Sequence, residues 1–428
     1  MKIALNKDFR IVLGISSLLS IFLITIYGVV VYYDTTSYID AWTSLQHGHL
    51  DSLRTPVYPV FLHALSIIFG QQHYLFIAIC VQHLIFLVSL LFFYKLLTYF
   101  CGSKRTLFWL SLIYGCFPAI SSWNNCILTE SLAISGTVFL LYSTFKTFEN
   151  PSIINGTILT VILLLLIFLR PIFIYIIPVY IVTSIILLSS SAKDKKGALA
   201  IGASVLITAL SSFLYMCEFK KEYGIYATSS VSVVNQYCIS RKYGLINTKL
   251  ITDNSVKSDI EAFILANGEE DVDLPIIWEE SQELFHKYKL ETLQKEIRES
   301  SCHNLIAIAR SVKTRLMDSG SKPLLFSPMW ISIISIVCSA FGIYLSTLYL
   351  FLALFTVILV AWVIKNKSIP WKTLLLFMLG VSNIVVAIVG AQDEWGRLIF
   401  PSMPIWFILF SQVLQIAKFK PISSVSLH

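Results

Sequence analysis

The sequence predicts an all-α protein that crosses a membrane many times. Apolar residues make up 56% of the 428-residue chain and charged residues only 13%, and the mean hydropathy is +0.75, values that exclude an ordinary soluble protein. The apolar residues gather in runs that approach or exceed the roughly 20 residues a helix needs to cross a bilayer. Because backbone polar groups in lipid must be bonded within their own segment, we expect helices.

Ten apolar runs are counted as spans, and the first is retained because it lacks the cleavage pattern of a signal peptide. They cover roughly residues 10–33, 72–98, 106–123, 127–146, 152–169, 171–190, 197–217, 329–364, 371–390 and 398–417. Residues 327–364 are long enough for two short spans, so part of this stretch is expected to be tilted, broken or re-entrant. Residues 56–70 are apolar but short and start with two prolines, which predicts a helix lying along the outer face.

Basic residues in the short connections predict the orientation, since cytoplasmic loops are enriched in lysine and arginine. The predicted cytoplasmic side carries Lys2, Lys7, Arg10, Lys104, Arg105, Lys146, Lys193, Lys195, Lys196, Lys365, Lys367, Lys372, Lys418 and Lys420, whereas Arg54, Arg170 and Arg397 fall on the other. Membrane anchoring thus explains the formal charge of +7. We expect membrane lipid as a partner and no nucleic acid.

The chain divides into three parts on this reasoning. Residues 1–217 form an N-terminal transmembrane module with a first outer loop at 34–70, residues 218–326 form an extracytoplasmic loop, and residues 327–428 form C-terminal helices. The extracytoplasmic part is predicted to serve as a lid or a partner surface rather than as an independent catalytic domain.

The extracytoplasmic part is predicted to contain both a strand-like stretch and a helix. It begins with a β-tolerant stretch, IYATSSVSVVNQYCIS, and ends in one amphipathic helix from Ile276 to about Ser300. Cys238 and Cys302 both fall here, and an oxidising compartment would permit a disulfide between them, a question that the spacing leaves open. The eight cysteines of the chain show no metal-binding spacing.

The polar stretch after the first span is the strongest functional signal. Asp34, Asp40 and Asp51 lie there together with Arg54, at the point where the chain leaves the membrane. Asp40 and Asp51 are interpreted as interfacial caps. The nearby histidines, His47 and His49, are interpreted as interface residues, and no structural metal is expected because no second ligand pair lies at metal spacing.

Other charged residues reach the same outer face from separate connections. They are Glu130 at the start of the fourth span, Arg170 at the break between the fifth and sixth, and Asp393, Glu394 and Arg397 in the last outer loop. A guanidinium suits phosphate because it presents a planar fork of donors and stays charged. A carboxylate suits a general base because it can accept a hydroxyl proton. The combination indicates transfer from a phosphate-linked donor held in the membrane.

The first outer loop combines Asp34 at the end of the first span with Tyr38, Ala41, Gly48 and the run Arg54 to Pro59. This pattern resembles the first outer loop of GT-C superfamily glycosyltransferases, and it is most similar to the polyprenol-phosphate-sugar branch with protein O-mannosyltransferases and lipid A aminoarabinose transferase. The segments that resemble the acidic second site, the helix break and the late outer loop of that fold are Thr129 to Leu132, Leu169 to Pro171, and Glu394 to Arg397 with Pro401 and Pro404.

The resemblance implies a GT-C-like bundle of about 10 to 12 transmembrane helices with outer-face interfacial helices. It implies Asp34 as the catalytic base and Glu130 as a second acid that orients acceptor or donor. It implies donor-phosphate or substrate contacts from Arg54, Arg397, Arg170, Glu394 and Tyr58. The chain departs from the family at Thr35, where many relatives have a second acidic residue, and at Arg54, where aminoarabinose transferases have lysine.

The expected reaction is attack by an acceptor hydroxyl on the anomeric carbon of a sugar carried by a polyprenyl monophosphate, with inversion. The acceptor is left open among glycolipid, polysaccharide and protein. No cofactor is expected, and a divalent metal stays open although two or three arginines can neutralise a monophosphate. The expected location is a bacterial inner membrane, with the active site facing the periplasm or cell exterior. A flippase, ligase or transporter of lipid-linked glycans is the alternative, and a non-enzymatic scaffold is a third.

Overall fold

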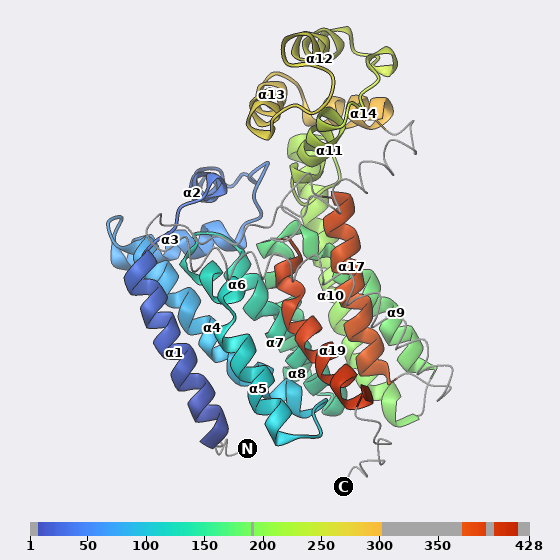
Figure 1. Cartoon of the computed structure of the whole chain (residues 1–428). Helices are drawn as coiled ribbons and strands as arrows, with labels where there is room; N and C mark the ends of the chain where they lie inside the picture. Colours follow the sequence, from blue (N-terminus) through green and yellow to red (C-terminus); the bar gives the residue numbers. More distant parts are fainter. Residues whose placement is uncertain (1–6, 190–191, 302–369, 391–397, 418–428) are drawn as a thin grey trace.

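The computed structural model describes residues 7–189, 192–301, 370–390 and 398–417. Every regular element among them is a helix, with one isolated parallel bridge between Val30 and Cys126. The predicted all-α class is therefore confirmed for the part of the chain that the structure describes. Figure 1 shows a bundle of long helices with a smaller helical unit above it.

The bundle is built around helix α7 (Glu130–Glu149). The other long helices of the bundle are α1 (Lys7–Tyr27), α4 (Tyr74–Thr98), α5 (Lys104–Cys116), α8 (Ile153–Leu169), α9 (Ile176–Leu188), α10 (Ala192–Tyr223), α17 (Trp371–Gly390) and α19 (Met403–Ala417). Most of α7 is buried. Small and hydroxylated residues let helices approach closely inside a membrane, and Thr144 on α7 illustrates this by bonding the Tyr180 hydroxyl of α9 at 2.6 Å.

Among the described residues, four helical stretches are long and apolar enough to cross a membrane on their own. They are Lys7–Tyr27, Tyr74–Thr98, Pro171–Leu188 and Lys195–Tyr223. Shorter apolar helices are Val57–Phe69, Ile153–Leu169 and Trp371–Ala387. These findings support a multi-pass membrane protein, while the count of 10 to 12 spans stays a prediction.

Two predicted spans end earlier than their apolar runs. The first was expected to reach residue 33, but its helix stops at Tyr27 because Gly28 adopts a left-handed φ of +56° and the next residues are extended. The third was expected to reach residue 123, but α5 ends at Cys116, just before Phe117 and Pro118. A residue before proline is pushed out of the helical region. Hydropathy alone does not detect these stops.

Helices α2 (Tyr33–Gln46) and α3 (Val57–Phe69) lie at the upper end of the bundle, where α3 crosses the ends of the long helices (Figure 1). One face of α3 is buried through Tyr58 and Leu62. The opposite face exposes Ile67 and Ile68, each about 70% accessible. The exposed apolar face is suited to contact lipid, as expected for a helix lying along a membrane surface, while its place on the outer face stays a prediction.

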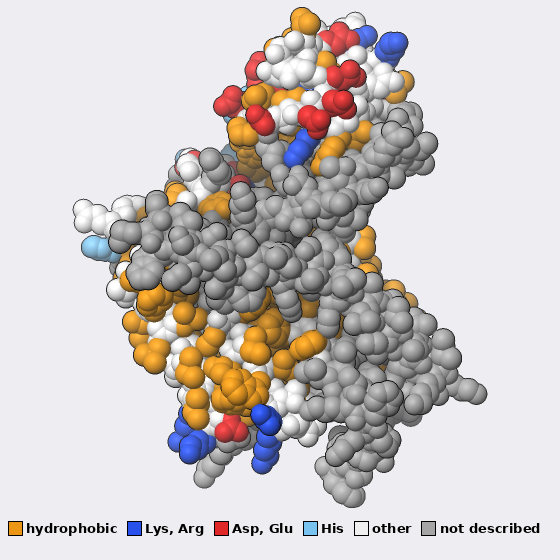
Figure 2. Space-filling view, viewed as in Figure 1, with side chains coloured by type: hydrophobic (Ala, Val, Ile, Leu, Met, Phe, Trp, Pro, Cys, Tyr) orange, Lys and Arg blue, Asp and Glu red, His pale blue; other side chains and the backbone are white. Residues whose placement is uncertain are grey.

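The lysine-rich helix ends that the structure describes gather at one end of the bundle, whereas Lys2, Lys365, Lys367, Lys418 and Lys420 lie outside the described residues. Lys372 at the start of α17 bonds Glu149 at the end of α7, with 2.8 Å between Nζ and Oε1, and lies over the ring of Tyr99 at the end of α4. Figure 2 shows Lys and Arg at the lower end, below a surface dominated by hydrophobic side chains. The helical unit of residues 224–301, called the outer domain below, lies at the opposite end (Figure 1).

The outer domain consists of α11 (Val231–Lys242), α12 (Asn254–Asn267), α13 (Leu274–Lys287) and α14 (Leu290–Ser301). It packs on the extended end of α10 around its own hydrophobic cluster, which includes Phe219, Tyr237, Ile277, Leu284 and Leu293. The predicted single helix from Ile276 to about Ser300 is wrong in detail, because a break at residues 288–289 divides it into α13 and α14. The break lets both helices turn their apolar faces toward one core.

The predicted β-tolerant stretch is also wrong, because most of it forms α11. Residues Val233, Val234, Tyr237 and Cys238 are all buried, a spacing that places them on one helical face. Burial of this face outweighs the strand preference of valine, because strand preference depends strongly on the surrounding packing. Cys238 is a free thiol, and burial raises its pKa to about 12. Cys302 lies outside the described residues.

A buried ion pair joins α11 to α13. Arg241 donates from Nε to Glu280 Oε2 at 3.0 Å and from Nη2 to Oε1 at 3.2 Å, and the Tyr237 hydroxyl donates to the same carboxylate at 2.9 Å. Both charged side chains are at most 3% exposed. Such a pair is tolerated when further hydrogen bonds satisfy its atoms, so it orients the two helices specifically.

Candidate functional site

The segment that leads into the first outer loop lies beside the turn before α7. The Val30 amide donates to the Asn125 carbonyl at 2.8 Å, and the Ile127 amide donates to the Val30 carbonyl at 3.1 Å. The Thr35 hydroxyl donates to the Ile127 carbonyl at 3.1 Å. These bonds bring the first turn of α2, which contains Asp34, next to the segment that leads into Glu130.

Arg54 is held in one orientation by groups on α2. Its Nη2 lies 2.7 Å from Asp34 Oδ1, its Nε donates to the Ser37 hydroxyl at 2.8 Å, and its guanidinium carbon lies 4.3 Å from the centre of the Tyr38 ring. The Asp34 side chain is 23% exposed and that of Arg54 is 11% exposed. The pair is therefore ordered but still open to a ligand.

Asp51 shapes the turn that carries Arg54. Its Oδ1 accepts hydrogen bonds from the backbone amides of Leu53 and Arg54, at 2.9 Å and 2.6 Å. The interpretation of Asp51 as a cap matches this geometry. A carboxylate that bonds successive amides stabilises a tight turn, so Asp51 positions the guanidinium without touching it.

Glu130 and Arg170 form a second ion pair inside the bundle. Glu130 Oε1 lies 3.3 Å from Arg170 Nη1, and the two side chains are 0% and 7% exposed. Glu130 is the first residue of α7, where the positive end of the helix dipole favours a carboxylate. Arg170 lies at the extended residue between α8 and the 3₁₀ turn Pro171–Tyr175. Both predicted site residues are thus brought together, and Arg170 has a carboxylate partner.

Tyr58 is fully buried beside the first pair. Its hydroxyl donates to Gln82 Oε1 at 2.9 Å, and its ring packs edge-on against Tyr38 at a centroid distance of 5.2 Å. Tyr58 therefore supports the ring that lies under Arg54, and in this structure its hydroxyl is bonded to Gln82. Glu394 and Arg397, the other predicted ligands, lie outside the described residues.

The described chain resumes at residue 398, close to the site. The ring of Phe400 lies 5.9 Å from that of Trp123, in the turn that leads to Glu130, and the 3₁₀ turn Phe400–Ser402 is buried. The turn Phe400–Ser402 therefore packs beside the segment that leads to Glu130.

The sequence reasoning missed the polar residues that join these segments. Gln82 on α4 donates from Nε2 to the carbonyls of Asn124 and Cys126, at 3.0 Å and 2.9 Å. Asn125 donates from Nδ2 to the carbonyl of Gly28 at 2.8 Å and bonds His83 at 3.0 Å. The available signal was a Gln82-His83 pair inside an otherwise apolar run, since polar residues at membrane depth are rare without a role.

Several buried donors beside Glu130 have no hydrogen-bond partner among the described residues. They are Trp123 Nε1, Asn124 Nδ2 and Thr129 Oγ1. A buried unpaired polar group costs roughly 1–3 kcal/mol, and native proteins keep few of them. Their concentration here is typical of a site that receives a polar ligand. Among the described residues, no group of three His, Cys, Asp or Glu side chains is placed to hold a metal ion.

No protein-family model matches the sequence, and no curated protein matches it. Among solved structures, the chain is similar to the Archaeoglobus fulgidus oligosaccharyltransferase, crystallised with a disulfide-tethered acceptor peptide containing the NVT sequon. The TM-score is 0.51 and the identity 12%, over 97% of this chain and 50% of that one. The chain therefore spans about half the length of the archaeal enzyme. At this identity the likeness shows the fold alone, and membership of the GT-C superfamily stays a prediction.

Proposed function

We propose that the protein is a membrane glycosyltransferase that moves a sugar from a polyprenyl-phosphate donor to an acceptor hydroxyl at the extracytoplasmic face of a bacterial inner membrane. The observation that carries this proposal is the Asp34–Arg54 pair, 2.7 Å apart and partly exposed, in the first outer loop of a fold shared with an oligosaccharyltransferase. In this proposal Asp34 serves as the base and Arg54 as the phosphate ligand, side by side.

In the proposed step, the acceptor oxygen attacks the anomeric carbon and Asp34 accepts the hydroxyl proton. The bond between the anomeric carbon and the phosphate oxygen breaks, and its electron pair stays on the phosphate. Arg54 then stabilises the growing negative charge. One guanidinium contacts both Asp34 and the donor phosphate in this proposal. Arg54 therefore also holds the phosphate next to the base. Direct displacement inverts the anomeric centre.

Glu130 has a supporting role in this proposal. It is buried against Arg170 and lies among the unpaired donors Asn124 Nδ2 and Thr129 Oγ1. The group is suited to orient a sugar, whose hydroxyls both donate and accept hydrogen bonds. Glu394 and Arg397 are retained as predicted donor contacts. The acceptor remains open among glycolipid, polysaccharide and protein.

The depth of the charged groups favours an enzyme over a transporter of lipid-linked glycans. Transporters place ionisable groups near the bilayer midplane on broken helices. Here Glu130 begins α7 and Arg170 follows the end of α8, and both helix ends lie on the side of the outer domain (Figure 1). Chemistry at the outer surface is therefore the better account.

The test is transfer by the purified full chain in lipid nanodiscs, supplied with synthetic polyprenyl-phosphate sugars and host envelope extract as acceptor. Mass spectrometry of envelope glycans with and without the gene identifies the sugar. We expect Asp34→Asn to abolish transfer, whereas Asp40→Asn on the same helix should leave it unchanged. Transfer by Asp34→Asn at the wild-type rate would refute the proposed mechanism.

A further inference from the structure

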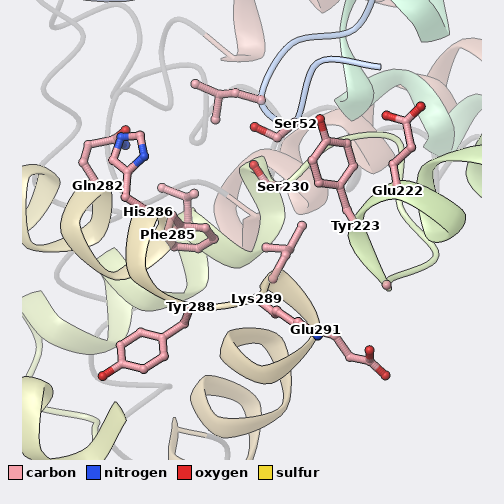
Figure 3. Close-up of a pocket in the computed structure, with 14 residues that line it drawn as sticks. Ser52, Glu222, Tyr223, Ser230, Gln282, Phe285, His286, Tyr288, Lys289 and Glu291 are labelled. Atoms are coloured by element: carbon pink, nitrogen blue, oxygen red, sulfur yellow. The ribbon is translucent and has the colours of Figure 1, made fainter. Parts of the chain in front are cut away.

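A pocket of about 530 Å³ lies between the first outer loop and the outer domain (Figure 3). Its volume falls within the roughly 300–1,000 Å³ typical of small-ligand sites, which often occur between domains. Its lining includes Ser52, Tyr223, Ser230, Gln282, Phe285 and His286. None of these residues belongs to either ion pair of the candidate site.

The pocket has fixed walls. The first outer loop is bonded to the end of α10, because the Leu50 amide donates to Glu222 Oε2 at 2.9 Å and the Tyr223 hydroxyl donates to the Leu50 carbonyl at 2.6 Å. The Ser230 amide donates to the Ser52 carbonyl at 2.7 Å. Leu50 also packs against the hydrophobic cluster of the outer domain, as does Leu53. The loop and the domain therefore form one continuous surface.

The chemistry of the lining suits a neutral, hydroxyl-rich ring. Figure 3 shows Gln282 and His286 on one side of Ser52 and Ser230, with Tyr223 on the other. The pocket also contains the half-buried ring of Phe285. A sugar ring offers C–H faces that pack on aromatic rings, and its hydroxyls bond amides and hydroxyls.

Charge gives no reason to expect an ionic ligand. The lining carries Glu222 and Glu291 but also Lys289, so neither sign dominates and a phosphate or a polyanion would meet carboxylates. Glu222 is already bonded to the loop. In Figure 3, Glu291 points away from Ser52 and Ser230. Apart from Lys289, the groups that remain are polar, aromatic or apolar.

The position of the pocket indicates which substrate it would receive. Its wall residue Leu53 directly precedes Arg54, and Asp51 bonds the amides of both. Consecutive Cα atoms are about 3.8 Å apart, so the backbone of the pocket wall continues directly into the residue that pairs with Asp34. The outer domain forms the opposite wall, on the side away from the bundle in which a donor lipid would be held (Figure 1). An acceptor reaches the pair from this side.

We propose that this pocket binds a sugar residue of an acceptor glycan and so presents the next hydroxyl to Asp34. This inference rests on the proposed function, and it selects a glycan rather than a protein as the acceptor. The pocket sets acceptor specificity, while Arg54 contacts the donor. The pocket recognises the acceptor and Arg54 recognises the donor, so neighbouring parts of the first outer loop contact the two substrates.

The first test measures steady-state kinetics in nanodiscs. Gln282→Ala removes the side-chain amide, and Phe285→Ala removes the ring, which also packs against the hydrophobic cluster. We expect each to raise the acceptor KM by about tenfold and to leave the donor KM unchanged, the pattern of lost ground-state binding. Glu283→Ala, an exposed residue of the same helix, is the matched control and should behave as wild type.

The second test measures binding without turnover. Oligosaccharides released by mild acid from the host envelope glycan are added to the full Asp34→Asn chain, and saturation-transfer NMR reports contact. We expect contact that is lost when Gln282→Ala is added. Transfer with an unchanged acceptor KM in both pocket variants would overturn this inference while the proposed function stands. Binding of a peptide instead of oligosaccharide would overturn it as well. An absence of transfer together with Gln282-dependent sugar binding would refute the proposed function and retain a sugar site.

Discussion

Arg54 Nη2 lies 2.7 Å from Asp34 Oδ1, across 20 residues of sequence. The Ser37 hydroxyl and the Tyr38 ring, one turn along α2 from Asp34, hold the other parts of the guanidinium. A guanidinium with several fixed partners is preorganised and loses less entropy when it binds a ligand. The pair is therefore a defined structural unit, and each of its two residues can be tested by substitution.

Arg54→Lys should weaken donor use although the charge is retained. Lysine cannot reproduce the fork that meets Asp34 and Ser37 together, and a hydrogen bond to a charged group contributes about 1.5–3 kcal/mol, so the donor KM should rise by at least tenfold, with Arg54→Ala worse. The exposed Arg298 provides the control substitution Arg298→Ala. An unchanged donor KM in Arg54→Ala would reduce Arg54 to a structural residue.

Asp34→Glu should also be a poor enzyme. One extra methylene displaces the carboxylate from its contact with Arg54, and misplacement by about 1 Å can cost about 10² in rate. Loss of the base in Asp34→Asn should cost about 10² to 10⁴ in kcat. Glu130→Gln should cost less, because Glu130 only orients a partner. If Asp34→Glu retained more activity than Glu130→Gln, the roles of the two acids would have to be exchanged.

Breaking the buried Glu130–Arg170 pair should destabilise the protein. Arg170→Met removes the cationic partner of a carboxylate that is 0% exposed, and removal of one partner of a buried pair costs about 3–5 kcal/mol. The double variant Glu130→Gln/Arg170→Met should recover most of this loss. The measurement is denaturant-induced unfolding in detergent micelles. Wild-type stability in Arg170→Met would show that the pair has no structural role and would favour direct substrate binding by Arg170.

The proposed orientation places the outer domain outside the cell. Leu265 on α12 is 89% exposed, so Leu265→Cys in a cysteine-free background should react with an impermeant thiol reagent on intact cells. Lys104→Cys, at the lysine-rich end, should react only after the membrane is opened. Labelling of Lys104→Cys on intact cells, with no labelling of Leu265→Cys, would invert the topology.

Glu296 should make the outer domain sensitive to acid. Burial by itself would raise the pKa of its carboxyl, but hydrogen bonds from the Thr252 amide at 2.6 Å and the Thr252 hydroxyl at 2.7 Å outweigh burial and lower it below the ordinary 4.5. A lowered folded-state pKa contributes stability above pH 4.5 that is lost as pH falls through the folded value. Glu296→Gln should flatten this dependence in hydrogen exchange of α14, whereas the exposed Glu299→Gln should not. An identical acid profile in Glu296→Gln would contradict this assignment.

Much of the fold was predictable because it depends on local composition. Apolar runs predicted most described helices of the bundle, since a segment in lipid must satisfy its own backbone groups. The proline-interrupted segment predicted α3 along the outer face. Lysine placement predicted which helix ends share a side, and Lys372 beside Glu149 is consistent with it. The stops of α1 and α5 were missed because they depend on Gly28 and Pro118 rather than on hydropathy.

The sequence by itself determined that the chain is an α-helical membrane protein, and it predicted that Asp34, Glu130, Arg54 and Arg170 reach one face. It could not determine their pairing, because both ion pairs join residues on different elements whose approach depends on packing. Only the tertiary structure decided that Asp34 binds Arg54, that Glu130 binds Arg170, and that the first outer loop forms a pocket with the outer domain. It also decided that α11 is a helix, because burial against Ile277 and Leu284 outweighs the strand preference of its valines.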